Sequence, residues 1–320
     1  MSSIAVTSAE TLSSPPTDLQ GEAELENLKI SYVLRQQPIS VTLDGKTIFL
    51  MSLALVLLIH FLDPYHAEVV IASFPILLLV HNDYQNFLNL GPGGTPSTFS
   101  GYLRISWFRL WALRDPFAAP KPDSMRLPTS GILWRQRLPY RAGPRPVVAG
   151  IAPQRQLDQH GSRVCYRALR WSMAKLANRS PKKFGTERSC IEKHGLALFA
   201  RHPVQTNCQG EICHVHDSDH SMHMCLHPDD IKEVLEKGWG QRHPLAWRSR
   251  FLKSPVSPDF VMVYAPRDDE ELQVICNIIE AAIWYTVAEE LEMGICPKPL
   301  LSIAQVETSS IEFNGYLAMQ

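Results

Sequence analysis

Histidine residues gather in one short stretch of this 320-residue chain, and a glycine-rich loop that follows adds an arginine and one more histidine. The members of this group are His214, His216, His220, His223, Arg242 and His243. Histidine is the side chain whose ordinary pKa lets it exchange protons near neutral pH, and its neutral ring is a common metal ligand. The two segments therefore predict a site that handles protons or binds a metal.

The alternation of apolar and polar residues predicts a β-hairpin over residues 211–226, with its turn at 217–220. In a hairpin closed by that turn, His214 lies opposite His223. Directly opposed residues have Cβ atoms about 5 Å apart. The register also places these histidines on the face opposite to Met222, so the sequence alone brings two histidines within reach of one shared ligand.

The elements around the hairpin predict its setting. Further strands are expected at 196–201 and 259–265, and helices at 155–179, at 228–237 and after Asp268. This order predicts the α+β class, with a small antiparallel sheet and helices packed on one face. The expected organisation has five parts: a disordered tail 1–46, a hydrophobic membrane segment 47–80, a connecting region 81–153 rich in Pro, Gly and aromatic residues, the α+β domain 154–290, and a peripheral C-terminal tail 291–320.

Composition narrows the functional classes. The chain has 31 Lys and Arg against 32 Asp and Glu, so no bulk charge predicts a nucleic-acid partner. Its seven cysteines form no CxxC pair, which argues against a disulfide framework and favours a reducing compartment. The helix at 155–179 has a basic face, which is either solvated or lies against anionic lipid.

Two apolar runs, 47–62 and 67–80, predict attachment to a membrane. A spanning helix needs about 20 apolar residues, so a single span and a re-entrant hairpin both remain open. A buried helical hairpin is the alternative. We expect the protein at a membrane, either the endoplasmic reticulum or another endomembrane.

Three interpretations of the histidines compete. The first is a polar strand face with satisfied histidines. The second is a zinc or iron site formed by His214, His216 and His223. The third, which the sequence favours, is oxygenation without a cofactor and with O2 as co-substrate. In it a neutral histidine removes a proton from an acidic enol, and a cation such as Arg242 stabilises the resulting anion.

Several segments together resemble the luciferases of luminous fungi. The most specific is the loop from Gly238 to Ala246, which reads Gly-Trp-Gly-Gln-Arg-His-Pro-Leu-Ala. The His-x-His-Asp pattern precedes it and Tyr264-Ala-Pro-Arg follows it. Upstream matches in the same order are Asp83-Tyr84-Gln85, Gly91-Pro92, Gly101-Tyr102, Leu138-Pro139-Tyr140-Arg141, Arg145-Pro146 and Gln154-Arg155. The similarity spans roughly residues 69–290.

The resemblance implies an activity. Fungal luciferases oxidise 3-hydroxyhispidin, a hydroxylated styryl-pyrone, with O2, release CO2 and leave an excited product. By resemblance we expect a membrane-anchored mono- or dioxygenase that acts on an electron-rich enol, hydroxypyrone or polyketide-like small molecule. Light emission is not implied. A non-catalytic, membrane-anchored binding module is the alternative from another class.

The candidate residues follow from both arguments. The expected catalytic residues are His214, His216, His223, His243 and Arg242. The expected substrate contacts are Asp217, His220, Gln241 and Trp239, although Trp239 also suits the core. The expected partners are a small-molecule substrate and a membrane.

Overall fold

The computed structural model describes residues 45–61, 66–123, 126–205, 208–248, 254–291 and 294–295. The chain forms two compact units, residues 1–79 and residues 80–320. Residues 1–44 of the predicted disordered tail 1–46, and residues 296–320, lie outside the described residues, whereas Gly45 and Lys46 of that tail begin a helix.

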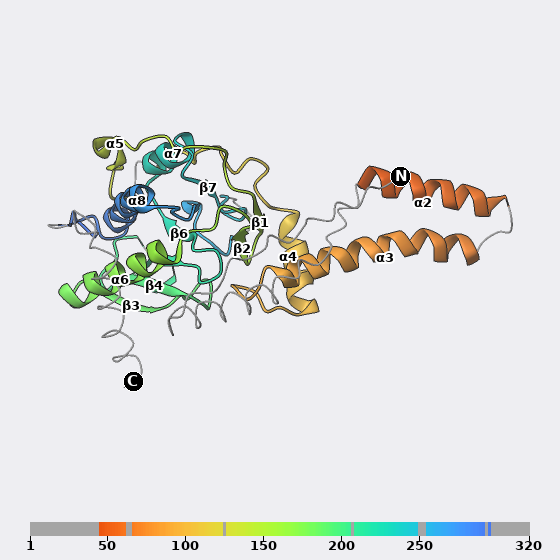
Figure 1. The fold of residues 1–320 in the computed structure, drawn as a ribbon, viewed down its shortest axis with the longest axis horizontal. Coiled ribbons are helices and arrows are strands. Elements are labelled where there is room, and N and C mark those ends of the chain that lie inside the picture. The colour runs from red at the N-terminus through yellow and green to blue at the C-terminus, as the bar shows by residue number, and fades with distance from the viewer. Residues whose placement is uncertain are drawn as a thin grey trace, which may run out of the picture. The chain divides into compact units, whose positions relative to one another are not determined.

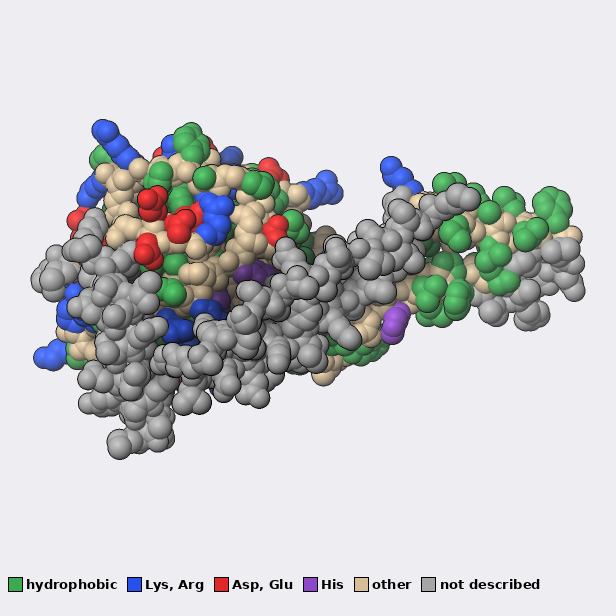
Figure 2. Space-filling model, in the orientation of Figure 1, with side chains coloured by type: hydrophobic (Ala, Val, Ile, Leu, Met, Phe, Trp, Pro, Cys, Tyr) green, Lys and Arg blue, Asp and Glu red, His purple; other side chains and the backbone are tan. Residues whose placement is uncertain are grey.

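Two apolar helices account for the described part of the first unit and for the start of the second. Helix α2 spans Gly45–His60, and helix α3 spans His66–Asn89 (Figure 1). Hydrophobic side chains crowd the surface of both helices (Figure 2), and Phe49, Met51 and Phe74 are each at least 60 % exposed. The predicted alternative of a buried hairpin is therefore not seen in the described residues.

No helix among the described residues is both long enough and apolar enough to cross a membrane. The structure therefore does not support the predicted membrane-spanning segment. Membrane attachment by other means stays a prediction.

The second unit contains a six-stranded sheet in which every neighbouring pair is antiparallel. In spatial order the strands are β3 (Phe184–Arg188), β4 (Leu196–Ala200), β5 (Glu211–Val215), β6 (Met222–Cys225), β8 (Phe260–Val263) and β7 (Gly240–Arg242). A separate pair of strands consists of β1 (Val148–Gly150) and β2 (Gln154–Gln156). The other elements are α4 (Phe99–Arg109), α5 (Leu133–Gln136), the 3₁₀ helix η1 (Cys208–Gly210), α6 (Arg163–Arg179), α7 (Pro228–Glu236) and α8 (Asp269–Val287).

Helices α6 and α8 cover the apolar face of the sheet. Ser162 caps α6 by accepting from the backbone N–H of Cys165, and Asp268 caps α8 in the same way. The core beneath them takes strand side chains from one face, namely Cys213, Val215, Met222, Met224, Val261 and Val263. The predicted α+β class, with an antiparallel sheet and helices on one face, is confirmed.

The register of the hairpin is also as predicted. His214 pairs with His223, and Val215 pairs with Met222. Because side chains alternate along a strand, the histidines point to the face that α6 and α8 do not cover. The predicted opposition of the two histidines is confirmed.

Three features differ from the sequence prediction. Helix α6 begins at Arg163 and not at residue 155, because residues 154–156 form strand β2. Strands β3 and β7 were not predicted. Ile295, from the expected peripheral tail, packs into the main core.

The basic residues Arg163 and Lys175 of α6 are exposed, and contact with lipid stays a prediction.

Candidate active site

Three buried histidines meet on the free face of the sheet. His214 and His216 come from β5 and the residue after it, and His223 comes from β6; each is at most 2 % exposed. The Nδ1 atom of His223 lies 3.0 Å from Nε2 of His216 and 3.3 Å from Nε2 of His214. One nitrogen from each ring therefore points into a common centre.

The other nitrogen of each ring has a polar partner on the outside of the cluster. His214 Nδ1 lies 2.6 Å from a carboxylate oxygen of Glu211. His223 Nε2 lies 2.8 Å from the side-chain oxygen of Gln154, which belongs to β2. These contacts fix the orientation of two of the rings.

The third ring is held by the turn of the hairpin. His216 Nδ1 lies 2.9 Å from Ser221 Oγ and 3.2 Å from Asp219 Oδ1. Asp219 also accepts from the backbone N–H groups of Gln156 and Ser221, at 2.6 and 3.1 Å. The buried carboxylate thereby joins the turn to β2 and positions His216.

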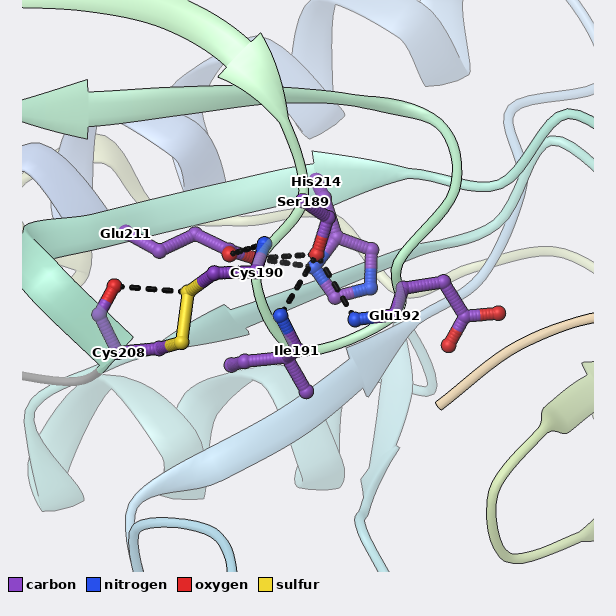
Figure 3. Close-up of a disulfide and its surroundings, with 7 residues drawn as sticks. All are labelled: Ser189, Cys190, Ile191, Glu192, Cys208, Glu211 and His214. Atoms are coloured by element: carbon purple, nitrogen blue, oxygen red, sulfur yellow. Dashed lines mark hydrogen bonds and ion pairs between the residues drawn. A yellow bond between two sulfur atoms is a disulfide. The ribbon is translucent and has the colours of Figure 1, made fainter. Parts of the chain in front are cut away.

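A disulfide lies beside the Glu211 partner of the cluster (Figure 3). Cys190 and Cys208, 18 residues apart, are bonded through their sulfur atoms. Glu211 accepts from the backbone N–H of Cys190 at 2.8 Å and from Ser189 Oγ at 2.9 Å. The sequence argument against a disulfide framework fails for this pair, because the fold brings together cysteines that lack a recognisable spacing.

Burial dominates the electrostatics of the cluster. It lowers the pKa of His216, and it lowers the pKa of His223 well below the ordinary value with help from the neighbouring histidines. Burial raises the pKa of Glu211, but the hydrogen bond from His214 and other donors outweigh it, so the net pKa is lowered. The site thus combines neutral rings at His216 and His223 with ionised carboxylates at Glu211 and Asp219.

The loop after α7 brings His243 next to the cluster, with its ring centroid 5.5 Å from that of His223. Both of its nitrogens have backbone partners: Nε2 lies 2.8 Å from the carbonyl oxygen of Ile151, and Nδ1 accepts from the N–H of Leu245 at 3.1 Å. Burial lowers the pKa of His243 to about 4. Its ring therefore stays neutral and ties the loop to Ile151, the residue that follows β1.

Arg242 points elsewhere. Its guanidinium donates to the backbone carbonyls of Ala118, Ala246 and Pro258. Burial lowers the pKa of Arg242. The structure places this side chain among loop carbonyls, outside the residues that line the cavity described below.

The four predicted substrate contacts are dispersed around the sheet. Asp217 accepts from the hydroxyl of Tyr166, and the ring of His220 stacks on the same tyrosine at 4.4 Å. Gln241 accepts from the hydroxyl of Tyr264, and Trp239 packs in the main core. None of the four lines the cavity beside the histidines.

A cavity of about 340 Å³ adjoins the cluster, with His223 and His243 in its wall. Most of the wall is apolar, with contributions from Ile105, Phe108, Ile151, Ala152, Ile191, Leu245, Pro255, Val256 and Phe260. The polar side chains of the lining include Thr95, Arg104 and Glu192, and the Cys190–Cys208 disulfide borders it. Its volume falls within the range of small-molecule sites.

Comparison with known proteins identifies the family. A family model described as "Luciferase domain" matches residues 209–282. The chain is 32 % identical over 236 residues to a luciferase of Neonothopanus nambi and 33 % identical over 236 residues to a luciferase of Armillaria mellea. Each match covers 68 % of this chain and 85 % of the relative.

The chain belongs to the fungal luciferase family. No solved structure gives a significant match to it.

In this member of the fungal luciferase family, three residues that hold the histidine rings were absent from the predicted site. They are Gln154, Glu211 and Asp219. Gln154 could have been predicted, because Gln154-Arg155 is one of the segments that carry the luciferase resemblance. Each acidic residue lies three positions from the histidine that it holds, within or beside the hairpin. Carboxylates this close in sequence to clustered histidines are the signal that could have identified Glu211 and Asp219.

Proposed function

We propose that this fungal luciferase family member is an O2-dependent oxygenase that oxidises an electron-rich enol or hydroxypyrone. Family membership supports an oxygenase-type enzyme in general. The observation that carries the finer proposal is the apolar cavity with His223 in its wall. A cavity of this kind suits a flat conjugated molecule, and the buried histidines supply the reactive polar group that such a substrate needs.

The cavity walls favour an aromatic or conjugated ring. Phe108 and Phe260 contribute aromatic side chains, and Ile105, Leu245 and Val256 contribute aliphatic ones. The ring of Phe260 stacks on His223, with centroids 5.0 Å apart. A planar pyrone held against these walls would displace water from the reaction, which strengthens electrostatic interactions there.

The proposed reaction needs no external reductant. The enol gives up its hydroxyl proton, and the electron-rich carbon of the resulting enolate forms a bond to O2. The electron pair comes from the enolate, and the new peroxide oxygen takes up the proton. One enol and one O2 thus become one α-hydroperoxy carbonyl compound, whose later breakdown determines the product.

The histidine cluster promotes loss of the enol proton in this scheme, and His243 holds the loop beside it. Arg104 is a cationic side chain of the cavity lining, so we assign it the stabilisation of the enolate. The same role for Arg242 stays a prediction. Its contacts with loop carbonyls favour a role in holding the loop.

The test is O2 consumption by the purified protein with a panel of hydroxypyrones. His223→Ala should lower turnover by about 10²–10⁴ if the cluster promotes proton removal. Val256→Trp should fill the cavity and raise KM. Val204→Trp, the same enlargement at an exposed position outside the lining, is the matched control. Binding of pyrones without O2 consumption would instead support the non-catalytic binding module.

We also propose that α2 and the first half of α3 attach the protein to an endomembrane. The support is the number of large apolar side chains that these helices expose, including Leu50, Leu57 and Ile76. Exposed apolar surface of this extent is typical of interaction sites. The full chain should sediment with membranes, and Leu50→Glu with Ile76→Glu should release it, whereas Val204→Glu should not. Sedimentation that is unaffected by the paired change would contradict the proposal.

A further inference from the structure

We infer that His214, His216 and His223 bind one divalent first-row transition-metal ion. The inference deepens the proposed function, and its catalytic part rests on that function. The binding site itself rests only on the arrangement of the three rings and their partners. It favours the metal alternative over oxygenation without a cofactor.

The hydrogen-bond partners determine which ring nitrogens carry hydrogen. The carboxylate of Glu211 and the amide oxygen of Gln154 only accept, so His214 Nδ1 and His223 Nε2 must donate to them. Ser221 Oγ gives its single hydrogen to Asp219 Oδ1 at 2.9 Å and can only accept from His216 Nδ1. A neutral imidazole carries one hydrogen. In the neutral form of each ring, the inner nitrogen therefore presents a lone pair.

Three lone pairs that face one another lack a donor. The inner nitrogens of His216 and His223 are 3.0 Å apart, and those of His214 and His223 are 3.3 Å apart. The three candidate ligand atoms all lie within 4.8 Å of one another. A tetrahedral ion with N–metal distances of about 2.0–2.1 Å requires nitrogens about 3.3–3.4 Å apart. For the two pairs that are 3.0 and 3.3 Å apart, shifts of a few tenths of an ångström would therefore give this spacing, and the third pair lies within 4.8 Å.

The hydrogen-bond partners of the three rings are those expected at a metal site. In metal proteins a ligand histidine usually donates its other ring N–H to a carboxylate, a carbonyl or water. Here Glu211, Asp219 and Gln154 fill that position for the three rings, and all three are at most 2 % exposed. If the histidines were only satisfied residues of a polar strand face, a buried hydrogen-bond acceptor behind every ring would not be required.

The ligand set narrows the class of metal. Three imidazoles suit Zn²⁺, Fe²⁺, Co²⁺ or Cu²⁺, whereas Mg²⁺ and Ca²⁺ prefer oxygen ligands. Three protein ligands are also the number found in catalytic zinc sites, where a fourth position is left for water or substrate. When bound, such an ion supplies Lewis-acid or redox chemistry next to the cavity wall that His223 forms. The chain's own residues hold the enol and exclude water.

The test measures metal directly. The full chain is purified without chelator, its metal content is determined by mass spectrometry, and the stripped protein is titrated with Co²⁺ while its visible absorbance is recorded. We expect one ion per chain and the bands of cobalt bound to imidazole. His216→Ala and His223→Ala should abolish both. Glu211→Gln should weaken Co²⁺ binding about 10–100-fold, because it alters the group behind His214 without removing a ligand.

His227→Asn is the matched control. His227 is a buried histidine outside the cluster that caps α7 by accepting from the N–H of Asp229, and asparagine can serve the same capping role. This variant should bind Co²⁺ like the wild type. Circular dichroism of each variant separates loss of the site from loss of the fold. Absence of metal from the wild type together with no cobalt spectrum would overturn the inference, and so would an equal loss in His227→Asn.

O2 consumption measured on the same samples separates this inference from the proposed function. Stoichiometric metal without O2 consumption on any hydroxypyrone would leave the metal site standing and refute the proposed function. O2 consumption by metal-free protein, unchanged when metal is restored, would keep the proposed function and refute the catalytic use of the ion.

Discussion

Replacing Asp219 with alanine should destabilise the second unit strongly, although the residue lies in a turn. Its carboxylate is 2 % exposed and accepts from the backbone N–H groups of Gln156 and Ser221. Each of these groups loses its acceptor in the variant, at a cost of about 1–3 kcal/mol for a buried donor. His216 keeps Ser221 Oγ as a partner and adds little. The sum is about 4 kcal/mol, within the range expected when a buried charged network is broken.

The free energy of unfolding can be followed for this unit alone. All seven tryptophans of the chain lie between residues 80 and 320, so tryptophan fluorescence during urea unfolding reports on the second unit. The change should appear as a lower midpoint with an unchanged slope. Asp217→Ala is the matched control, two residues away in the same turn.

The control should lose far less. Asp217 is exposed and accepts only from the hydroxyl of Tyr166 among the described contacts, which is worth about 0.5–1.5 kcal/mol. The reasoning is refuted if Asp219→Ala and Asp217→Ala lower the free energy of unfolding equally. It is also refuted if Asp219→Ala costs less than about 1 kcal/mol.

Three further predictions concern stability. Replacing Cys190 and Cys208 by serine should lower the free energy of unfolding by about 3 kcal/mol, the chain-entropy value for cysteines 18 residues apart. Burial raises the pKa of Asp230 to about 6, so its protonation stabilises the fold most below about pH 4, and this contribution is lost as the pH rises through 6. Asp230→Asn should therefore gain stability relative to the wild type between pH 4 and pH 7, by roughly 3 kcal/mol. Gly240→Ala should cost about 1–3 kcal/mol, because its Cβ would lie 2.3 Å from a backbone oxygen of β8.

The same unfolding measurements check all three. A reducing agent should lower the stability of the wild type by more than that of the double serine variant, in which Cys276 is still disulfide-bonded. A gap between Asp230→Asn and the wild type that does not vary with pH would contradict the raised pKa. Gly185→Ala is the control for Gly240→Ala, because a Cβ there meets nothing closer than 3.5 Å. Equal losses in the two alanine variants would contradict the steric argument.

The sequence predicted the structure best where a single periodicity of apolar residues determined which way the side chains point. Alternation along the hairpin placed His214 opposite His223 and put Met222 on the other face, and the structure confirms that register. The antiparallel sheet and the helices on one face also followed from the pattern. Strand β7 did not, because Gly240–Arg242 is too short to show a period and pairs with a strand that comes about 20 residues later.

The polar contacts of the site were harder to predict because they join distant segments. Nothing local to Gln154 indicates that its side chain reaches His223, 69 residues away. The contacts of loop residues were equally hard to predict from the sequence. His243 and Arg242 are neighbours in sequence, yet the ring of His243 lies against the histidine cluster, whereas the side chain of Arg242 donates to the carbonyls of Ala118, Ala246 and Pro258. Sequence identifies such residues as chemically capable, but only tertiary structure tells which way each one points.

Strand β2 determines where a chimera between two members of the family can be joined. The segment recognised by the family model, residues 209–282, holds all four histidines of the site but neither Gln154 nor the Gln156 backbone N–H that anchors Asp219. A chimera with its junction at residue 209 would pair these histidines with supports shaped for a different protein. A transferable module that keeps both these supports and the cavity wall therefore begins before Gly94 and runs through α8.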